Sequence, residues 1–132
     1  PIAVLNYAGI PITHRGIAQS FHIVTGMTGT NEKLNWEALA KEKGTLVFMM
    51  GLENIERIVS NLITNGKDKE TSAAVVMRGT SSKQRKVIGT LENITDKARE
   101  AQLKSPCIIV VGEVVNLNEK LSWYEEKPCL YY

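Results

Sequence analysis

Three strongly apolar segments are the feature that most constrains what this chain can fold into. They span residues 46–50, 73–77 and 107–115. A strand with one face in water alternates apolar and polar residues, whereas a strand covered on both faces is apolar almost throughout. The three segments therefore predict strands buried inside a sheet that is covered on both sides.

Patterns typical of helices alternate with these segments. Shorter helices are predicted over residues 36–43, with Asn35 as the N-cap, and over residues 92–102. Between the first two apolar segments, a helix that ends near Gly66 is predicted by helical spacing of apolar residues at Ile55, Ile58, Val59, Leu62 and Ile63. Strands that alternate with helices are typical of α/β proteins.

Two weaker strands complete the predicted sheet. Residues 17–25 are rich in β-branched and aromatic residues, and residues 84–91 alternate weakly. We expect one domain, residues 1–132, of the α/β class: a mixed, largely parallel central sheet of about five strands flanked by helices. The segments 17–25 and 84–91 are the candidates for antiparallel strands.

The composition restricts the class of protein. The 132 residues are 43% hydrophobic and 23% charged, which suits one globular domain. No apolar run approaches the ~20 residues of a membrane span and no signal-peptide pattern opens the chain, so we expect a cytoplasmic protein with no membrane partner. The net charge of +2 comes from residues scattered along the chain, which argues against nucleic acid as a partner.

Glycines at the ends of the predicted strands suggest a ligand site. Gly51, Gly79 and Gly112 stand at or near the ends of apolar runs. In open α/β sheets, ligands gather outside the carboxyl ends of the strands, and glycine lets backbone amides approach a ligand closely. We therefore expect the three glycines to share one pocket. The alternative is that each glycine only permits a tight turn.

Other kinds of chemistry lack their usual patterns. His14 and His22 have neither the spacing nor the neighbouring carboxylates of a zinc site, so we expect no metal. The chain has no phosphate-binding loop, no Gly-x-Ser-x-Gly motif and no self-contained catalytic group. His14 and Arg15 are the best polar pair, although a solvated surface loop is the alternative interpretation.

Several motifs, in order along almost the whole chain, resemble the C-terminal half of the uroporphyrinogen-III C-methyltransferases, a family of tetrapyrrole methylases. The resemblance is specific because the motifs occur as a set. They are Gly9 to Arg15 (Gly-Ile-Pro-Ile-Thr-His-Arg), Val24-Thr25-Gly26, Asn35 to Ala40, Thr45 to Gly51, Gly79-Thr80 with Gln84, Gly89-Thr90-Leu91, Val110 to Val115 and Leu121 to Tyr124.

The resemblance implies a cofactor and a division of labour. In the family, the proposed Asp and Lys acid/base pair belongs to an N-terminal domain, and S-adenosylmethionine lies in the cleft between that domain and the C-terminal one. Met50 and Gly79 match family positions that touch the cofactor, and Gly51 and Gly112 join them through the strand-end argument. We expect the chain to be a C-terminal fragment that supplies one wall of the cleft, with no catalytic residue and no activity alone.

The resemblance also implies a substrate and partners. The family methylates two pyrrole carbons of uroporphyrinogen III, which gives precorrin-2 on the way to sirohaem and cobalamin. Because this substrate is ringed with carboxylates, guanidinium groups are its natural clamps, and Arg15 is the first candidate, with His14 as a weaker neighbour. Family members form homodimers, and in some a uroporphyrinogen-III synthase follows; a fused synthase after Tyr132 stays open.

Two alternative functions remain at this point. Another precorrin methyltransferase would share the fold and the cofactor, but the segments 9–15 and 45–51 are closer to the uroporphyrinogen enzymes. A non-catalytic binding or dimerisation domain would have strand-end glycines that face no ligand. Two departures from the family pattern are Met49, where Tyr is usual, and Met27, where His is usual; the first is expected to change the packing of the pocket floor.

Overall fold

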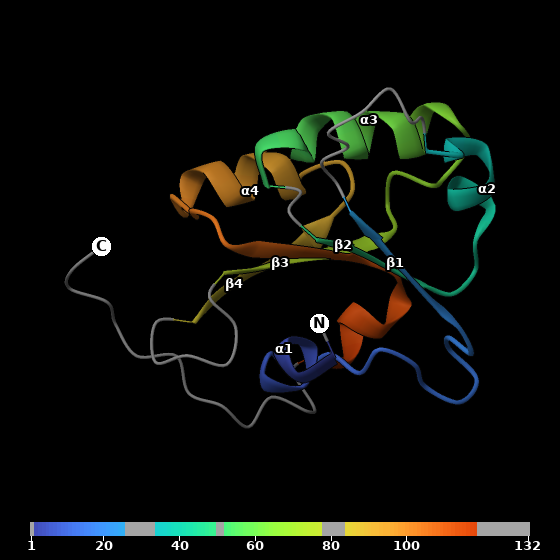
Figure 1. The fold of residues 1–132 in the computed structure, drawn as a ribbon, viewed down its shortest axis with the longest axis horizontal. Coiled ribbons are helices and arrows are strands. Elements are labelled where there is room, and N and C mark those ends of the chain that lie inside the picture. Colours follow the sequence, from blue (N-terminus) through green and yellow to red (C-terminus); the bar gives the residue numbers. More distant parts are fainter. Residues whose placement is uncertain (1, 26–33, 50–51, 78–83, 119–132) are drawn as a thin grey trace.

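The computed structural model describes residues 2–25, 34–49, 52–77 and 84–118, and these form a five-stranded sheet between two layers of helices (Figure 1). The strands lie in the order β1-β2-β5-β3-β4. Their bounds are β1 (Phe21–Thr25), β2 (Thr45–Met49), β3 (Ser72–Met77), β4 (Arg85–Thr90) and β5 (Cys107–Val111). A mixed sheet of five strands flanked by helices is confirmed.

The sheet has fewer parallel strand pairs than the sequence predicts. Only β1 and β2 pair in parallel, whereas β2 with β5, β5 with β3, and β3 with β4 are antiparallel. The prediction of a largely parallel sheet is therefore wrong. The prediction that residues 17–25 form an antiparallel strand is also wrong, because β1 pairs in parallel with β2. The prediction of an antiparallel strand at residues 84–91 is confirmed.

The reason lies in how the strand-helix-strand units interleave. Strands joined through a helix do run in the same direction, as their alternation with helices predicts: β1 with β2, β2 with β3, and β4 with β5. In the last two units, however, the two strands are not neighbours. β5 lies between β2 and β3, and β3 lies between β4 and β5. Each intervening strand runs the opposite way, so most neighbours are antiparallel.

Three helices cover one face of the sheet (Figure 1): α2 (Trp36–Lys41), α3 (Ile55–Thr64) and α4 (Ile94–Glu100). The apolar stripe of α3 is confirmed, because Ile55, Ile58, Val59 and Leu62 are buried. Both predicted caps are confirmed as well. The Asn35 side chain accepts a hydrogen bond from the Ala38 N–H at 3.1 Å, and Gly66 follows α3 with a φ of 109°.

The other face is covered by α1 (Ile2–Tyr7), by the segment 8–18 and by the 3₁₀ helix η2 (Glu113–Leu117). Leu5 and Ile10 pack there against strand residues such as Val110, all fully buried. The predicted strand 107–115 is too long. It ends at Val111, and η2 buries Val114 and Val115 under the sheet, so one apolar run serves two elements.

The remaining element boundaries differ from those predicted by a few residues. β1 begins at Phe21 rather than at residue 17, because residues 14–18 form a turn closed by backbone hydrogen bonds between His14 and Ala18. A short 3₁₀ helix η1 (Leu52–Asn54) precedes α3. Within the described ranges, no helix is long and apolar enough to pass through a membrane.

Candidate functional site at the carboxyl edge of the sheet

The strands that lead to Met50 and Gly79 end at the same edge of the sheet. β1, β2 and β3 run in one direction, and we call the edge at which they end the carboxyl edge. β5 lies between β2 and β3, where Ile108 pairs with Met49 and Cys107 pairs with Met77. The ends of β2 and β3 are therefore two strand spacings apart, about 10 Å.

The common edge of β2 and β3 is compatible with one pocket for three of the four predicted cofactor residues, those that follow these two strands. Met50, Gly51 and Gly79 themselves lie outside the described residues, so their contacts stay predictions. Met49 is described and is half-buried as the last residue of β2. A ligand bound across the carboxyl edge would lie within reach of the chain after both strands, because 10 Å is less than the length of a nucleoside-sized ligand.

Gly112 does not belong to this group. β5 runs antiparallel to β2 and β3, so its end lies where they begin, at the opposite edge, which we call the amino edge. The Gly112 N–H donates to the carbonyl of Ser72 at 2.9 Å, and a Cβ on Gly112 would lie 3.5 Å from the Thr45 Cα. Grouping Gly112 with Gly51 and Gly79 is wrong, because the argument assumed parallel strands. Its φ of 150° supports the alternative of a tight turn.

His14 and Arg15 occupy the turn that precedes β1. The His14 N–H donates to the Ala18 carbonyl at 2.8 Å, and the Ala18 N–H donates back at 2.9 Å. The His14 Nδ1 lies 3.0 Å from the Arg15 carbonyl oxygen. Both side chains are exposed and line an open hollow of about 350 Å³ together with Thr13, Ala18 and Gln19. A guanidinium and an imidazole are thus presented to solvent on one short turn.

The structure does not bring this turn together with the carboxyl edge. The turn leads through Ser20, whose carbonyl accepts from the Thr45 N–H at 2.9 Å, into the amino end of β1. The five residues of β1 separate it from the carboxyl edge by about 13 Å. The backbone of this turn and the ends of β2 and β3 therefore lie at opposite edges of the sheet.

Arg85 and Lys86 begin β4 and Lys104 precedes β5, so these three cationic residues lie near the carboxyl edge of the sheet. The Arg85 Nη1 donates to the carbonyl oxygen of Gln84, a buried residue just before β4, at 2.6 Å. The Lys104 N–H donates to the sulfur of Met77 at 3.2 Å, which packs the segment before β5 against the end of β3. The Lys86 Nζ donates to the Ala8 carbonyl at 3.0 Å and so fastens the end of α1 to β4.

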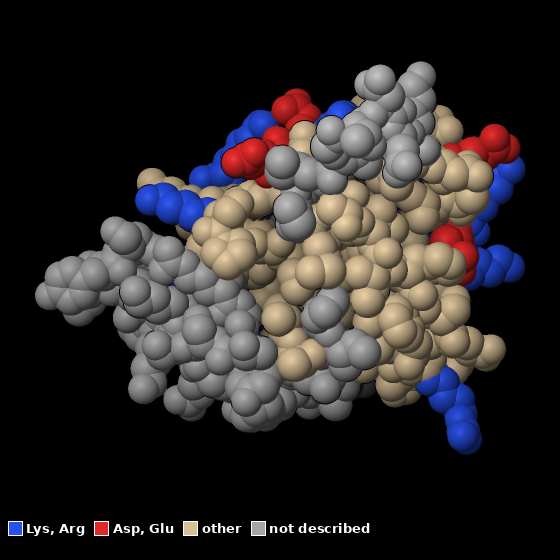
Figure 2. Space-filling view, in the orientation of Figure 1, with Lys and Arg blue, Asp and Glu red and all other residues tan. Residues whose placement is uncertain are grey.

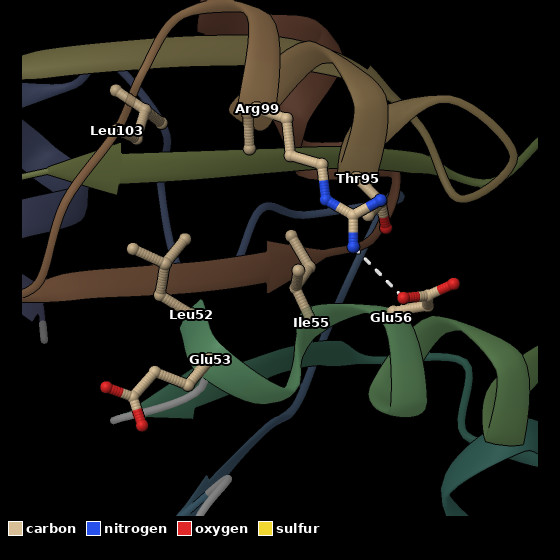
Figure 3. A pocket seen from close by; sticks show the side chains of 8 residues that line it. Leu52, Glu53, Ile55, Glu56, Thr95, Arg99 and Leu103 are labelled. Atoms are coloured by element: carbon tan, nitrogen blue, oxygen red, sulfur yellow. Dashed lines mark hydrogen bonds and ion pairs between the residues drawn. The ribbon is translucent and has the colours of Figure 1, made fainter.

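A hollow of about 260 Å³ opens beside the carboxyl end of β2, between η1, α3 and α4 (Figure 3). Leu52, Ile55 and Leu103 give it apolar walls, and the Arg99 Nη2 bonds the Glu56 Oε2 at 3.0 Å on its rim. Ligand pockets usually measure about 300–1,000 Å³. We interpret this hollow as a packing groove between helices rather than as a binding site.

At the amino edge, the Glu42 carboxylate contacts groups from two segments, its own connection between α2 and β2 and the beginning of β1. Its Oε1 accepts from the Gly44 N–H at 3.0 Å and from the Ser20 hydroxyl at 3.3 Å, and its Oε2 lies 3.6 Å from the His22 Nε2. The hydrogen bond from the Gly44 N–H has the largest effect and lowers the pKa of Glu42. Burial opposes it, and the neighbouring His22 and the Ser20 hydroxyl lower the pKa further. Ser20 and His22 both face Glu42, an arrangement unlike a hydrolase triad, in which the serine faces the histidine.

Lys67 closes the same cluster. Its Nζ donates to the Glu42 carbonyl oxygen at 3.0 Å, and burial lowers the pKa of Lys67.

Among the described residues, no group of three or more His, Cys, Asp and Glu side chains is placed to hold a metal ion. Sequence reasoning missed the cluster around Glu42 and the contact of Lys86, because neither has a local motif. Apart from Gly44, the partners lie 20 or more residues away in the sequence.

Comparison with known proteins gives one consistent result. The family described as "Tetrapyrrole (Corrin/Porphyrin) Methylases" matches residues 1–95. The "Uroporphyrinogen-III C-methyltransferase" of Bacillus subtilis (strain 168) is 45% identical over 133 residues, 98% of this chain and 27% of that protein. The "Siroheme synthase" of Thiobacillus denitrificans is 46% identical over 127 residues, 96% and 26% of the two chains. The chain spans about a quarter of the length of these curated relatives.

Solved structures agree in fold. The uroporphyrin III C-methyl transferase from Thermus thermophilus is 29% identical and has a TM-score of 0.73 over 86% of this chain and 50% of that one. The same enzyme has also been solved in complex with S-adenyl homocysteine. A cobalt precorrin-4 methyltransferase has a TM-score of 0.76 over 86% of this chain and 48% of its own, but at 19% identity it shows the fold alone.

Proposed function

Because the chain belongs to the family of tetrapyrrole (corrin/porphyrin) methylases, we propose that residues 1–132 form the C-terminal domain of a uroporphyrinogen-III C-methyltransferase. The observation that carries the proposal is the 45% identity to an enzyme of that name over nearly the whole chain. The whole protein converts uroporphyrinogen III to precorrin-2, for sirohaem and cobalamin biosynthesis. The domain supplies one wall of the site and no catalytic acid or base.

The methyl donor is S-adenosylmethionine, bound at the carboxyl edge. Met50, Gly51 and Gly79 contact it, partly through main-chain groups. Support comes from the common edge at which β2 and β3 end and from the homologous Thermus enzyme, which has been solved with the demethylated product of that donor. The domain's task is orientation, because holding the methyl group in line with the acceptor carbon removes several kcal/mol from the barrier.

The substrate is uroporphyrinogen III, and Arg15 binds one of its carboxylates, with His14 beside it. Support comes from the exposed turn that presents both side chains around an open hollow. The separation of about 13 Å between this turn and the carboxyl edge suits a ligand of macrocycle size and not a small one. Arg15 would then hold the substrate by its periphery, remote from the reacting carbon.

We also propose the remaining properties of the whole protein from its family: a cytoplasmic homodimer, with a fused uroporphyrinogen-III synthase as an open extension after Tyr132. The cobalt precorrin-4 methyltransferase shares only the fold and does not favour a different substrate. A non-catalytic domain is disfavoured by the high identity to named methyltransferases.

A chimera tests the proposal. The matching half of the Thermus enzyme is replaced by residues 1–132, and transfer of a labelled methyl group from S-adenosylmethionine to uroporphyrinogen III is measured. We expect turnover in the chimera. In an Arg15→Ala variant, the KM for the tetrapyrrole should rise about tenfold or more with a smaller change in kcat, because a remote ionic contact contributes mainly to binding.

Two controls make the result interpretable. Arg57→Ala removes an exposed arginine from α3, away from the proposed site, and should leave KM unchanged. A folded chimera that binds S-adenosylhomocysteine but transfers no methyl group to uroporphyrinogen III, while methylating another precorrin, would contradict the proposed substrate.

A further inference from the structure

The core under the helices contains an aromatic side chain close to the carboxyl edge. Among the residues whose burial the structure describes, Phe48 is the one aromatic residue in the core. It precedes Met49, the last residue of β2, and lies between Val24 of β1 and Ile109 of β5 in the register of the sheet. The other buried members of its cluster carry aliphatic or sulfur-containing side chains. The aromatic ring is thus placed at the end of the sheet where the methyl donor is proposed to bind.

Trp36 stacks on this ring. The two ring centroids are 6.1 Å apart and the ring planes are inclined by 19°. Stacked aromatic pairs usually have centroids about 4.5–7 Å apart, and they add to the stability that burial alone provides. Trp36 is the first residue of α2 and is half-buried against the same cluster. The stack therefore joins the beginning of α2 to the carboxyl end of β2.

Several features of α2 fix the place of Trp36. The Asn35 side chain caps the helix just before it, and Ale40 is replaced by no larger residue.

Discussion

Single residues of this chain show how far local conformation decides a role. Gly112 has a φ of 150°, a region that is nearly closed to residues with a side chain. Space is not the constraint, because a Cβ there would lie 3.5 Å from the Thr45 Cα, an ordinary contact. The backbone turn from β5 into η2 therefore requires glycine at this point, and the requirement is independent of any ligand.

The substitution Gly112→Ala separates these two roles. It should lower the free energy of unfolding by about 1–3 kcal/mol, because alanine must adopt a strained backbone conformation. Urea denaturation of the chain measures this change, with Ala101→Gly, at an exposed C-cap, as a mild control. The affinity of the chimeric methyltransferase for S-adenosylhomocysteine should stay unchanged. Normal stability combined with weakened binding would return Gly112 to the cofactor site.

At the scale of elements, the sequence predicts most helices and strands but not how they are ordered. The stripe of α3 and the apolar runs of β2 and β3 are local signals, and each is confirmed. The position of β5 between β2 and β3 is set by packing across distant segments, and no local pattern reports it. α1 was missed because its residues, buried by the far face of the sheet, have no helical stripe long enough to detect.

The same scale governs the acid sensitivity of the amino edge. The Glu42 carboxylate joins β1 to the connection between α2 and β2 through Ser20, His22 and Gly44. Its pKa in the folded chain lies below the value of 4.5 that it has in an open chain. The carboxylate therefore contributes stability that is fully present above that value and is lost as the pH falls through the lowered pKa of the folded state.

Glu42→Gln should remove this part of the acid response. The variant should be less stable than the wild type at neutral pH, and the difference should shrink below pH 4.5 as the wild-type carboxylate takes up a proton. Urea midpoints from neutral to acid pH measure it. Glu37→Gln, which removes an exposed helix carboxylate paired with Lys41, is the matched control and should change little. A difference that persists unchanged in acid would contradict the assignment to Glu42.

For the whole molecule, the site is only partly predictable from these residues. The resemblance and the carboxyl-edge argument both point to Met50 and Gly79, because strands that run in the same direction end at one edge wherever they stand in the sheet. The same argument fails for Gly112, since the direction of β5 depends on the order of the strands. The distance between Arg15 and the carboxyl edge, likewise, follows from the path of the chain under the sheet and from no motif.

The size of the domain leads to a last prediction about activity. The Thermus methyltransferase has as much chain again with no counterpart here, because the matched part covers 50% of it. A cleft with one wall leaves a bound methyl donor open to water, and it supplies neither the second set of contacts nor the proton acceptor that methyl transfer to a pyrrole carbon requires. The purified 132-residue chain, mixed with S-adenosylmethionine and uroporphyrinogen III, should therefore transfer no labelled methyl group above the rate without protein. The chimera, assayed in parallel, verifies that the reagents are competent. Turnover by the chain alone would mean that its own residues hold a complete site.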